Sequence, residues 1–368
     1  MQGSKALTRK SMKNITNKNK VILGLSGGVD STAAVLLLKE QGFEVTGAYL
    51  DVLGSGPDGA RDALAIAGQL EINLIIINIS GEFENIVIAG FCSEYLNGRT
   101  PNPCVICNPE IKFRSLLKAA DESGAYYIST GHYANVRYDK KESCYYINKA
   151  NNEKKDQSYM LYRLRQETLE RLLLPLGEAV TKGQVRTYVA ESGIMNAGAK
   201  DSQEICFLPK NTNYADYIKS RGYSGHDGEF SDMQSNIIGR HRGILRYTVG
   251  QRKNLGMTFG KPMFVVKIDQ EKNMVFLGGN DELFSKEAIS RSNNFPLSDG
   301  GEMPEKYDGM RVMAKVRYRA EAAEAVISKV DKDTVKTVFA NAQRAVTPGQ
   351  SIVFYAGGKV IGGGIIDV

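Results

Sequence analysis

The stretch VILGLSGGVDS (Val21–Ser31) decides the fold class of this chain. Its apolar run, Val21–Leu25, indicates a buried strand, and a helical pattern opens at Val29, directly after two glycines. Glycines let backbone N–H groups come close to an anion, and the N-terminus of a helix adds its partial positive charge. We therefore interpret this turn as a phosphate cradle rather than as a tight strand-to-helix packing turn.

The cradle contains no lysine, which excludes the Gly-x-x-x-x-Gly-Lys-Ser/Thr loop that grips β- and γ-phosphates. The pattern that remains, Ser-Gly-Gly-x-Asp-Ser, resembles the PP-loop of ATP pyrophosphatases, which cleave ATP between the α- and β-phosphates and leave AMP on a substrate. The resemblance implies that Asp30 holds Mg²⁺, because hard cations on phosphates prefer carboxylate oxygens. The residues implied in ATP binding are Gly24, Leu25, Ser26, Gly27, Gly28, Val29, Asp30 and Ser31.

Composition limits the class of protein. The 368 residues suffice for two or three domains with separate cores, and 42% hydrophobic and 24% charged residues are ordinary for a soluble protein. No run approaches the ~20 apolar residues of a membrane span, and the N-terminus has no apolar signal-peptide core. Five cysteines without a secretion signal favour a reducing compartment. We expect a cytoplasmic protein without membrane contact, and a monomer.

The net charge of +6 resides in the first twenty residues, which hold six cations and no acid. The remaining residues are formally neutral, so any surface for nucleic acid must come from local clustering. Such an arm is typically solvated, and we expect residues 1–19 to form a disordered basic arm. The cations of this stretch are Lys5, Arg9, Lys10, Lys13, Lys18 and Lys20.

Two later clusters of cations could form such a surface. Residues 239–261 carry six lysines and arginines and no acid, with Tyr247 and Phe259 interleaved, a pattern typical of surfaces that contact phosphate and stack on bases. In the second cluster Lys315, Arg317 and Arg319 alternate with other residues. A period of two predicts that these three cations share one face of a strand, and a solvated edge strand would look the same.

The rhythm of apolar runs divides the chain. Alternating strands and helices in residues 20–208 predict a doubly wound parallel α/β sheet with the glycine loop at the carboxyl end of its first strand, where such sheets bind ligands. Residues 209–282 predict a small central β-rich domain, and residues 283–368 predict a C-terminal β-barrel. The expected early elements are strands Val21–Leu25, Glu44–Leu50 and Ile72–Ile79, helices from Val29 and Asp58, and helices Asn85–Tyr95, Glu110–Ser123 and Gln166–Leu174. The expected later strands are Phe264–Ile268, Met274–Leu277, Arg311–Tyr318, Ala323–Lys329, Thr334–Phe339, Ser351–Tyr355 and Val360–Ile366.

The cysteines give a second chemical signal. The segment TPNPCVICN (Thr100–Asn108) holds a Cys-x-x-Cys pair, Cys104 and Cys107, in what we expect to be a stiff, proline-punctuated loop that presents the thiols. Cys206, in DSQEICF, lies ninety-nine residues beyond Cys107. Two interpretations stay open here: a catalytic or redox pair of thiols, and an iron–sulfur cluster held by three cysteines. A structural zinc would need a fourth ligand, and a second Cys-x-x-Cys is absent.

The other two cysteines lie in apolar patterns. Cys92 belongs to a helical pattern and Cys144 to a strand-like run. We expect both to be inert core thiols, because a buried cysteine behaves as a small hydrophobic residue.

These motifs together resemble the bacterial tRNA-specific 2-thiouridylases, PP-loop enzymes with an adenine nucleotide alpha hydrolase-like fold. That family thiolates C2 of the wobble uridine, position 34, in the tRNAs for Lys, Glu and Gln. The resemblance covers roughly residues 20–368 and leaves out the basic arm. It rests on SGGVDS, TPNPCVICN with Ile111-Lys112-Phe113, Thr130-Gly131-His132-Tyr133, Lys155-Asp156-Gln157-Ser158-Tyr159, DSQEICF, Tyr247–Lys253 and Val346–Gln350.

The resemblance implies a reaction in two stages. Adenylation of the C2 oxygen of uridine supplies AMP as a leaving group, with release of pyrophosphate. A persulfide on Cys206 then delivers sulfur to C2, and Cys107 resolves the S–S bond, which leaves a Cys107–Cys206 disulfide. This chemistry suits thiols, because a persulfide is more acidic than a thiol and exchange needs a second thiolate nearby. The implied cofactors and partners are ATP, Mg²⁺, tRNA and a persulfide donor or relay protein.

The resemblance also implies residues for substrate binding. Leu50 and Gly131 would line the adenine and ribose pocket. Asn102, Pro103 and Cys104 would contact the target uridine, which must leave its stack to expose C2. The positions implied in tRNA binding are His132, Lys155, Asp156, Gln157, Arg317, Tyr318 and Gln350.

The chain departs from the family pattern at Cys104, where many members carry Asp. A thiol with a pKa near ~8.5 is not equivalent to a carboxyl group near ~4. The trio Cys104, Cys107 and Cys206 instead resembles the three-cysteine site of related thiolases, whose 4Fe–4S cluster binds sulfide at an open iron. The persulfide relay and the cluster-bound sulfide therefore stand as two mechanisms for one reaction.

Two other classes of protein share part of this pattern. A PP-loop synthetase that forms amides would need the glycine loop without the cysteines. A non-catalytic RNA-binding module would need the basic β-rich half without ATP cleavage. Neither class accounts for the loop, the cysteines and the basic region together.

Overall fold

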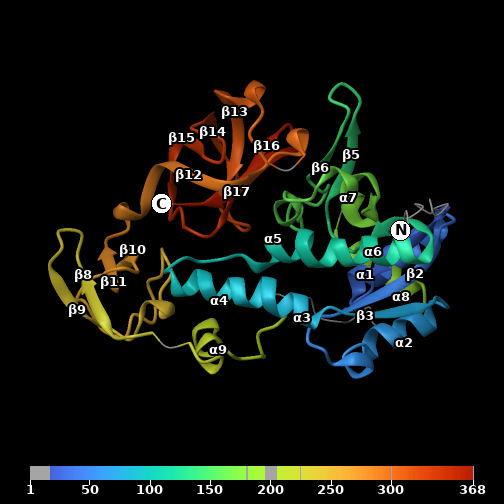
Figure 1. Cartoon of the computed structure of the whole chain (residues 1–368), viewed down its shortest axis with the longest axis horizontal. Helices are drawn as coiled ribbons and strands as arrows, with labels where there is room; N and C mark the ends of the chain where they lie inside the picture. The colour runs from blue at the N-terminus through green and yellow to red at the C-terminus, as the bar shows by residue number, and fades with distance from the viewer. Residues whose placement is uncertain (1–16, 180, 195–204, 224, 300, 368) are drawn as a thin grey trace, which may run out of the picture.

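The computed structural model describes residues 17–179, 181–194, 205–223, 225–299 and 301–367 (Figure 1). An α/β part forms one end of the molecule, a small β-sheet forms the other end, and a β-barrel lies beside them (Figure 1). Residues 1–16 of the expected basic arm lie outside the described residues. Residues 17–19, which we assigned to the arm, begin the first strand instead, because the Asn17 backbone N–H donates to the Gly124 carbonyl at 2.9 Å.

The α/β part contains a five-stranded sheet of order β3-β2-β1-β4-β7, and each pair in it is parallel. Adjacent residues of a strand point to opposite faces, and accordingly Val21 packs with α1 while Ile22 packs with α6. Helices cover both faces, so the predicted doubly wound parallel sheet is confirmed. Its strands are β1 (Asn17–Gly24), β2 (Glu44–Asp51), β3 (Leu74–Asn78), β4 (Ala125–Ser129) and β7 (Leu172–Leu173). Its helices are α1 (Val29–Glu40), α2 (Arg61–Gln69), α6 (Arg114–Ser123) and α8 (Lys182–Glu191).

The order of the strands reverses between β1 and β4. The carboxyl ends of these two strands lead into Leu25–Ser31 and Thr130–His132, which therefore meet at the switch point of the sheet. Ligands of doubly wound sheets bind at such a point, which fixes where a site for the glycine loop can be built.

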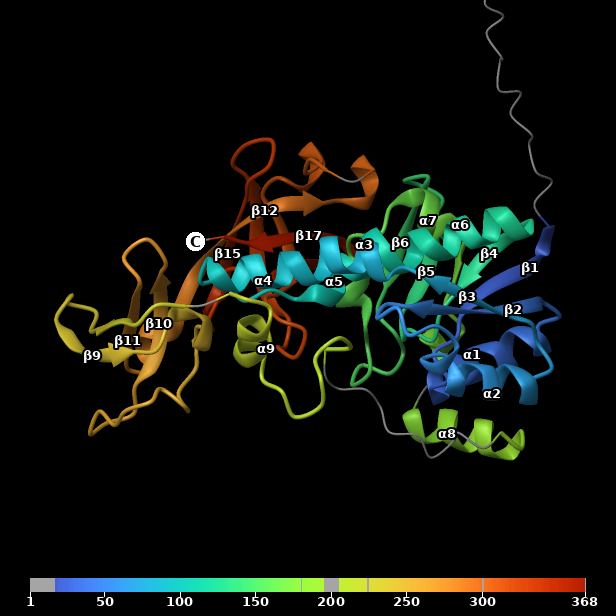
Figure 2. The same cartoon turned by 60° about the horizontal axis from the view of Figure 1, so that its bottom comes forward.

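Two long helical rods run side by side through the middle of the molecule (Figures 1 and 2). Each contains a π-helical stretch in which backbone bonds run from residue i to i+5. The first rod is α3 (Ser80–Phe83), η2 (Glu84–Ile88) and α4 (Ala89–Leu96). The second is α5 (Pro103–Cys107), η3 (Asn108–Phe113) and α6.

The Cys-x-x-Cys pair lies in the first turn of the second rod, so our prediction of a loop there was wrong. Pro103 occupies a first-turn position, where its missing N–H costs nothing and its fixed φ suits a helix. Asn102 caps this end, because its Oδ1 accepts the Cys104 backbone N–H at 3.2 Å. The second proline thus starts a helix instead of extending a loop.

The predicted helix Gln166–Leu174 is also too long. Helix α7 (Gln166–Glu170) stops, and the chain turns into the short edge strand β7. The Ile128 backbone N–H donates to the Arg171 carbonyl at 2.9 Å, and Leu172 becomes buried against the sheet. Pairing with β4 therefore overrides the local helical pattern.

Six strands of order β12-β15-β14-β13-β16-β17 close into a barrel through pairing of β12 with β17, which confirms the predicted C-terminal barrel. Its core includes Phe295, Ile327, Phe354 and Ile361. The barrel strands are β12 (Phe284–Asn294), β13 (Met310–Lys315), β14 (Ala323–Lys329), β15 (Val335–Arg344), β16 (Ser351–Ala356) and β17 (Lys359–Ile366).

The barrel contradicts our assignment of three cations to one strand face. Strand β13 ends at Lys315, and Arg317 and Arg319 lie in the turn that follows. The Ala320 backbone N–H donates to the Arg317 carbonyl at 3.2 Å, which closes that turn, so the period of two stops at Lys315.

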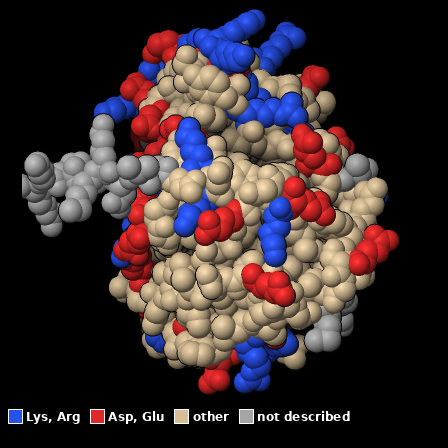
Figure 3. Space-filling view, turned by 90° about the vertical axis from the view of Figure 1, so that its right-hand side faces the viewer, with Lys and Arg blue, Asp and Glu red and all other residues tan. Residues whose placement is uncertain are grey.

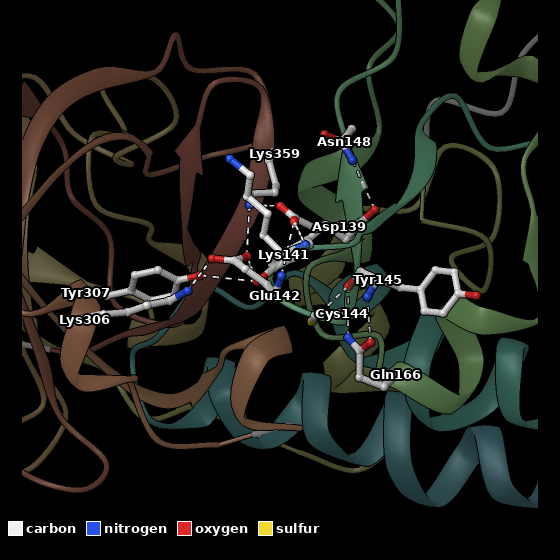
Figure 4. Close-up of polar contacts among 11 residues, drawn as sticks. Asp139, Lys141, Glu142, Cys144, Tyr145, Asn148, Gln166, Lys306, Tyr307 and Lys359 are labelled. Atoms are coloured by element: carbon white, nitrogen blue, oxygen red, sulfur yellow. Dashed lines mark hydrogen bonds and ion pairs between the residues drawn. The ribbon is translucent and has the colours of Figure 1, made fainter.

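A hairpin of the α/β part extends the barrel sheet. Strand β6 (Cys144–Asn148) pairs with β17 on one side and with β5 (Asn135–Asp139) on the other. Four charged residues join the hairpin to the barrel, and we call them the hairpin clasp (Figure 4). Lys359 lies 3.1 Å from both Asp139 and Glu142, and Lys306 pairs with Glu142 as well.

The central β-rich region forms a four-stranded sheet of order β10-β11-β8-β9 around Phe230 and Val265. Helix α9 (Tyr214–Ser220) precedes it. The strands are β8 (Gly228–Ser231), β9 (Ile237–His241), β10 (Phe264–Asp269) and β11 (Met274–Gly278). Short 3₁₀ turns are η1 (Gly56–Asp58), η4 (Ser158–Leu161), η5 (Pro175–Glu178), η6 (Ile244–Arg246), η7 (Asp281–Leu283), η8 (Pro296–Ser298) and η9 (Glu305–Tyr307).

The surface at the α/β end carries cations and acids interspersed among uncharged side chains (Figure 3). A face of mixed sign gives no single field to attract a polyanion. Within the described ranges, no helix has the length and apolar character needed to cross a membrane.

Candidate functional site

The glycine loop between β1 and α1 is built from close backbone approaches. Gly27 has a φ of +80°, and a Cβ there would lie 2.7 Å from the Asp62 Cβ at the start of α2. Ser31 Oγ donates to the Gly28 carbonyl at 2.9 Å and accepts the Ser26 backbone N–H at 3.3 Å. The loop thus leads directly into the N-terminus of a twelve-residue helix, where unpaired N–H groups favour an anion.

Two residues that sequence reasoning missed hold the Asp30 carboxylate. Tyr133 donates its hydroxyl to Asp30 Oδ1 at 2.7 Å, and the Lys182 ammonium pairs with the same oxygen. Lys182 is the first residue of α8, which the Thr181–Gln184 capping box positions. The loop has no lysine in sequence, yet a distant helix brings one to it. The Thr181–Gln184 pattern could have predicted the start of α8, but not its position beside the loop.

The turn after β4 lies against the glycine loop. A Cβ at Gly131 would stand 2.7 Å from the Asp30 carbonyl carbon and 2.8 Å from the Ser31 nitrogen, so only glycine fits. Leu50, at the end of β2, is half-buried and packs against the core between the sheet and the second rod. Leu50 thus lies on β2 and Gly131 follows β4, and these two strands flank β1.

The structure brings Cys104, Cys107 and Cys206 into one neighbourhood. All three are free thiols, with Cys104 and Cys206 exposed and Cys107 half-buried. Negative charge on Cys206 or Cys104 raises the pKa of the Cys107 thiol, so the three sulfurs lie within electrostatic range of one another. Cys206 borders residues 201–204 of DSQEICF, which lie outside the described residues. Cys92 and Cys144 are buried, as the sequence predicted.

Burial raises the pKa of Cys107 to about 11, and it also raises the pKa of Cys104 and of Cys206. Solvent reaches Cys104 and Cys206, but crowding by neighbouring protein atoms still disfavours a thiolate there. At neutral pH the three groups are therefore thiols, and a sulfur nucleophile at this site needs a counter-charge.

Lys112 supplies that charge. It lowers the pKa of all three thiols, and its backbone hydrogen bond lowers the pKa of Cys107 further. In an α-helix a residue five positions on points about 140° away. The π-helical stretch Asn108–Phe113 instead bonds residue i to i+5, which brings Lys112 onto the face of Cys107. Sequence analysis included Lys112 in a motif but gave it no role.

His132 lies beside this cation. Burial, followed by the charge of Lys112, lowers the pKa of His132 well below its usual value, so the ring is neutral. Thr130 Oγ1 and His132 Nδ1 lie 2.7 Å apart, and the Phe113 ring packs at 5.9 Å between centroids. The turn Thr130–His132 thus contacts the glycine loop through Gly131 and lies beside Lys112 through His132.

Three of the residues implied in tRNA binding lie in one stretch before η4. Asp156 is buried, and its carboxylate accepts the Ala150 backbone N–H at 2.9 Å and the Ser158 hydroxyl at 2.7 Å. Gln157 Oε1 accepts the Tyr133 backbone N–H at 2.9 Å. The side chains of Asp156 and Gln157 therefore shape the loop, and Lys155 begins the same stretch.

The remaining residues implied in tRNA binding, Arg317, Tyr318 and Gln350, belong to the barrel. Tyr318 packs against Tyr159 at 6.1 Å between ring centroids. Burial raises the pKa of Tyr318, and negative charge on Asp156 and, to a smaller extent, on Cys104 raises it further. Arg317 donates to the Ala345 carbonyl and to Thr347 Oγ1. Gln350 Nε2 donates to the Thr100 carbonyl at 2.8 Å, so this side chain contacts the cysteine segment directly.

In the described part of the chain, the three thiols do not form a ligand set for a metal cluster. Among the described residues, no group of three or more His, Cys, Asp or Glu side chains is close enough to hold a metal ion. The three thiols share a neighbourhood without the tight grouping that an iron–sulfur cluster requires.

Three family models match successive parts of the chain. Residues 19–210 match the family model described as the tRNA methyl transferase HUP domain. Residues 215–279 match the tRNA methyl transferase PRC-barrel domain, and residues 301–366 match the aminomethyltransferase beta-barrel domain.

Individual relatives match over nearly their full length. The tRNA-specific 2-thiouridylase MnmA of Clostridioides difficile is 44% identical over 360 residues, covering 95% of this chain and 98% of the relative. That of Acetivibrio thermocellus is 45% identical over 365 residues, covering 95% of this chain and 100% of the relative. The MnmA 1 protein of Caldanaerobacter subterraneus is 45% identical, covering 95% and 98%. The chain belongs to the family of tRNA-specific 2-thiouridylases.

Proposed function

We propose that this protein is a tRNA-uridine 2-sulfurtransferase that acts on the wobble uridine of the tRNAs for Lys, Glu and Gln. It adenylates the C2 oxygen, replaces that oxygen with sulfur, and releases AMP and pyrophosphate. One observation carries the proposal. The turn Thr130–His132 lies against the glycine loop at Asp30 and beside the cation, Lys112, that faces the three thiols. An activation site and a sulfur site therefore adjoin.

ATP would occupy the loop Gly24–Ser31, with Mg²⁺ at Asp30. It would supply the adenylyl group that turns the C2 oxygen into a leaving group. The Asp30 carboxylate, with its side chain 34% exposed, has an oxygen available beside Lys182. Such an arrangement suits a hard cation on phosphate. Lys182 and the helix N-terminus would balance the charge of the α-phosphate.

The sulfur stage would use the cysteines in sequence. The Cys206 thiol attacks the outer sulfur of a donor persulfide and gives up its proton, and the donor leaves as a thiol. The outer sulfur on Cys206 attacks C2, and the C2–O bond to AMP breaks. The Cys107 thiolate then attacks Cys206 Sγ, which frees 2-thiouridine and forms a Cys107–Cys206 disulfide. A dithiol reductant takes up that disulfide and restores two thiols.

The raised thiol pKa values favour formation of a persulfide on Cys206 before the attack on C2. A persulfide is more acidic than its parent thiol, so it supplies an anionic nucleophile where Cys206 itself stays protonated. Lys112 would stabilise that anion, because its charge lowers the pKa of every thiol at the site.

The tRNA would lie along the cysteine segment, the barrel turn at Tyr318 and the cations of residues 239–261. Asn102 and Pro103 begin α5, and Cys104 is exposed there, so they are placed to meet a flipped uridine. We also propose domains 20–208, 209–282 and 283–368, and a monomer that works in the cytoplasm with a persulfide donor protein. The five-stranded parallel sheet, the four-stranded central sheet and the closed barrel support that division, and the β5–β6 hairpin joins the first domain to the barrel sheet.

Cysteine variants assayed under anaerobic conditions test the relay against the cluster. Cys206→Ser and Cys107→Ser should abolish multiple-turnover thiolation, whereas Cys144→Ala, at a buried thiol of β6, should retain it. Purified protein should contain less than stoichiometric iron and still thiolate from a persulfide donor. Activity that depends on iron and is lost in Cys104→Asp would overturn the relay and favour the 4Fe–4S alternative.

A further inference from the structure

The connection between the two helical rods is held by the last strand of the barrel. Arg99 Nη1 lies 2.7 Å from Asp367 Oδ1, and Nη2 donates to the Ile366 carbonyl at 3.1 Å. On its other side Arg99 Nε lies 2.8 Å from Glu94 Oε2 in α4. One guanidinium thus ties the end of the first rod to the end of the barrel, and such charge-assisted bonds are the strong ones.

Both backbone groups of the next residue are bonded to the barrel. The Thr100 N–H donates to the Pro348 carbonyl at 2.9 Å, and its carbonyl accepts Gln350 Nε2 at 2.8 Å. Gly349, at a φ of +89°, allows this approach, because a Cβ there would stand 2.8 Å from the Thr100 nitrogen. A loop residue held at its N–H, its carbonyl and its neighbouring side chain has little freedom to move.

The barrel side of this contact is itself fixed. Asp367 also lies 2.9 Å from Arg291 Nε in β12, and its backbone N–H donates to the Ile289 carbonyl at 2.8 Å. The side-chain bond from Arg99 lowers the pKa of Asp367, so the carboxylate stays charged at neutral pH. Arg99 is only 23% exposed, which limits screening of the pair by solvent.

The held residues lie just before the cysteines. From Thr100 the chain runs through Pro101, Asn102 and Pro103 into α5. Two prolines fix their φ angles, so a displacement at Thr100 passes to the N-terminus of α5 with little loss. The position of Asn102 and Cys104 therefore depends on the barrel.

We propose that the barrel positions the cysteine helix, with Arg99, Gln350 and Asp367 acting as positioning residues for thiolation. We call Arg99, Thr100, Gln350 and Asp367 the barrel clamp. The proposal rests on the proposed function for its kinetic consequence. It gives Gln350 a role through Thr100, in place of the tRNA contact that the family resemblance implies.

Thiol reactivity tests the clamp without tRNA or ATP. In Asp367→Asn and Arg99→Ala, alkylation of Cys104 and Cys107 by iodoacetamide, followed by mass spectrometry, should change by about tenfold. Alkylation of buried Cys144 should stay the same, which reports that the fold is intact. Arg99→Lys should react at a rate between those of Arg99→Ala and the wild type. Lysine keeps the positive charge but lacks the several N–H donors of the guanidinium group. Unchanged alkylation of Cys104 and Cys107 in both variants would overturn the proposal.

Single-turnover kinetics separate positioning from tRNA contact. In Asp367→Asn and Gln350→Ala, thiolation should slow about tenfold while the tRNA Kd stays within about twofold of wild type. The matched control is Lys329→Gln, which removes a cation paired with Glu302 and Glu305 inside the barrel, and it should leave both quantities unchanged.

A tRNA Kd that weakens as much as the rate falls would show direct tRNA contact and overturn the proposal. A wild-type protein that forms no thiouridine would instead refute the proposed function. The alkylation experiment would still decide whether the clamp positions the cysteines.

Discussion

At the scale of single residues, the chemistry depends on a balance between burial and one cation. Burial raises the pKa of Cys107 to about 11, while Lys112 acts in the opposite direction. Cys104 and Cys206 also contribute, since negative charge on either raises the pKa of Cys107. The site therefore keeps its thiols protonated at neutral pH.

Removal of Lys112 should make this visible. In the wild type, the alkylation rate of Cys107 should rise with pH across the range 7 to 11 and reach about half of its plateau near pH 11, because its pKa is about 11. Lys112→Met should move the inflection to higher pH and slow alkylation at pH 8, because the thiolate loses its counter-charge. The measurement is the iodoacetamide rate at Cys107 between pH 7 and 11, and Arg114→Met, at an exposed neighbour, is the control. A variant whose inflection moves to lower pH would contradict this assignment.

A second prediction concerns the lysine that the fold brings to the glycine loop. Lys182→Met should raise the KM for ATP about tenfold and leave the tRNA Kd unchanged, since a cation beside Asp30 would contact phosphate. Lys39→Met is the matched control. Lys39 lies in the last turn of α1 and donates to the Leu70 carbonyl at 2.7 Å, away from the loop. An equal effect of both variants on KM would argue against a role for Lys182 at the nucleotide.

At the scale of elements, sequence reasoning succeeded where the pattern is local. Sequence patterns within a few residues predicted β1, its glycine loop and α1. These patterns are the apolar run Val21–Leu25, the two glycines and the helical pattern from Val29. It failed where tertiary contacts decide. Pairing with β4 ends α7 early, and Pro103 starts a helix because Asn102 caps it. The π-helical register that directs Lys112 to Cys107 has no period that sequence analysis could detect.

The hairpin clasp gives a prediction at this scale. Burial acts to raise the pKa of Glu142, but bonds from Lys306, Tyr146 and Lys359 outweigh it and lower the pKa to about 2. A lowered carboxyl pKa adds stability above the unfolded value, 4.5, and that stability is lost as pH falls toward 2. Glu142→Gln should therefore lower the free energy of unfolding by about 1–2 kcal/mol at pH 7.

Urea unfolding at pH 7, 5, 4 and 3 measures this difference. The gap between wild type and Glu142→Gln should be constant from pH 7 to pH 5 and should shrink below that. Glu287→Gln, whose partner is the half-exposed Lys336, is the control and should change stability by less than about 1 kcal/mol. A gap that grows as the pH falls would contradict the sign of the shift.

At the scale of the whole molecule, the central sheet has its own core, whereas Val353, Tyr355 and Val360 of the barrel pack into the core of the α/β part. The α/β part contains the glycine loop and the two helical rods, residues 239–261 contain six cations, and Gln350 of the barrel donates to the Thr100 carbonyl. The rhythm of apolar runs and helical patterns predicted the α/β, central β-rich and barrel parts. It could not predict that β17 and Asp367 contact segments more than two hundred residues away, because no local pattern reports such pairs.

The cations of residues 239–261 should govern how salt affects tRNA binding. Each phosphate contact that is lost should reduce the slope of log K against log salt by about 0.7–0.9. The variant Arg240→Gln, Arg252→Gln, Lys253→Gln should therefore bind tRNA with a shallower slope. The control variant, Lys272→Gln, removes an exposed cation of the same domain outside that stretch. An unchanged slope in the triple variant would place the tRNA elsewhere.

The central claim is that one site couples ATP cleavage at the α-phosphate to sulfur transfer. The most direct measurement is a single turnover with unmodified tRNA, ATP and persulfide-loaded protein, in which AMP and 2-thiouridine are counted together. We predict one AMP for each 2-thiouridine and neither product without tRNA. In Cys206→Ser, we expect no 2-thiouridine and at most one AMP for each protein molecule. Thiouridine formed without AMP, or AMP formed equally well without tRNA, would contradict the account.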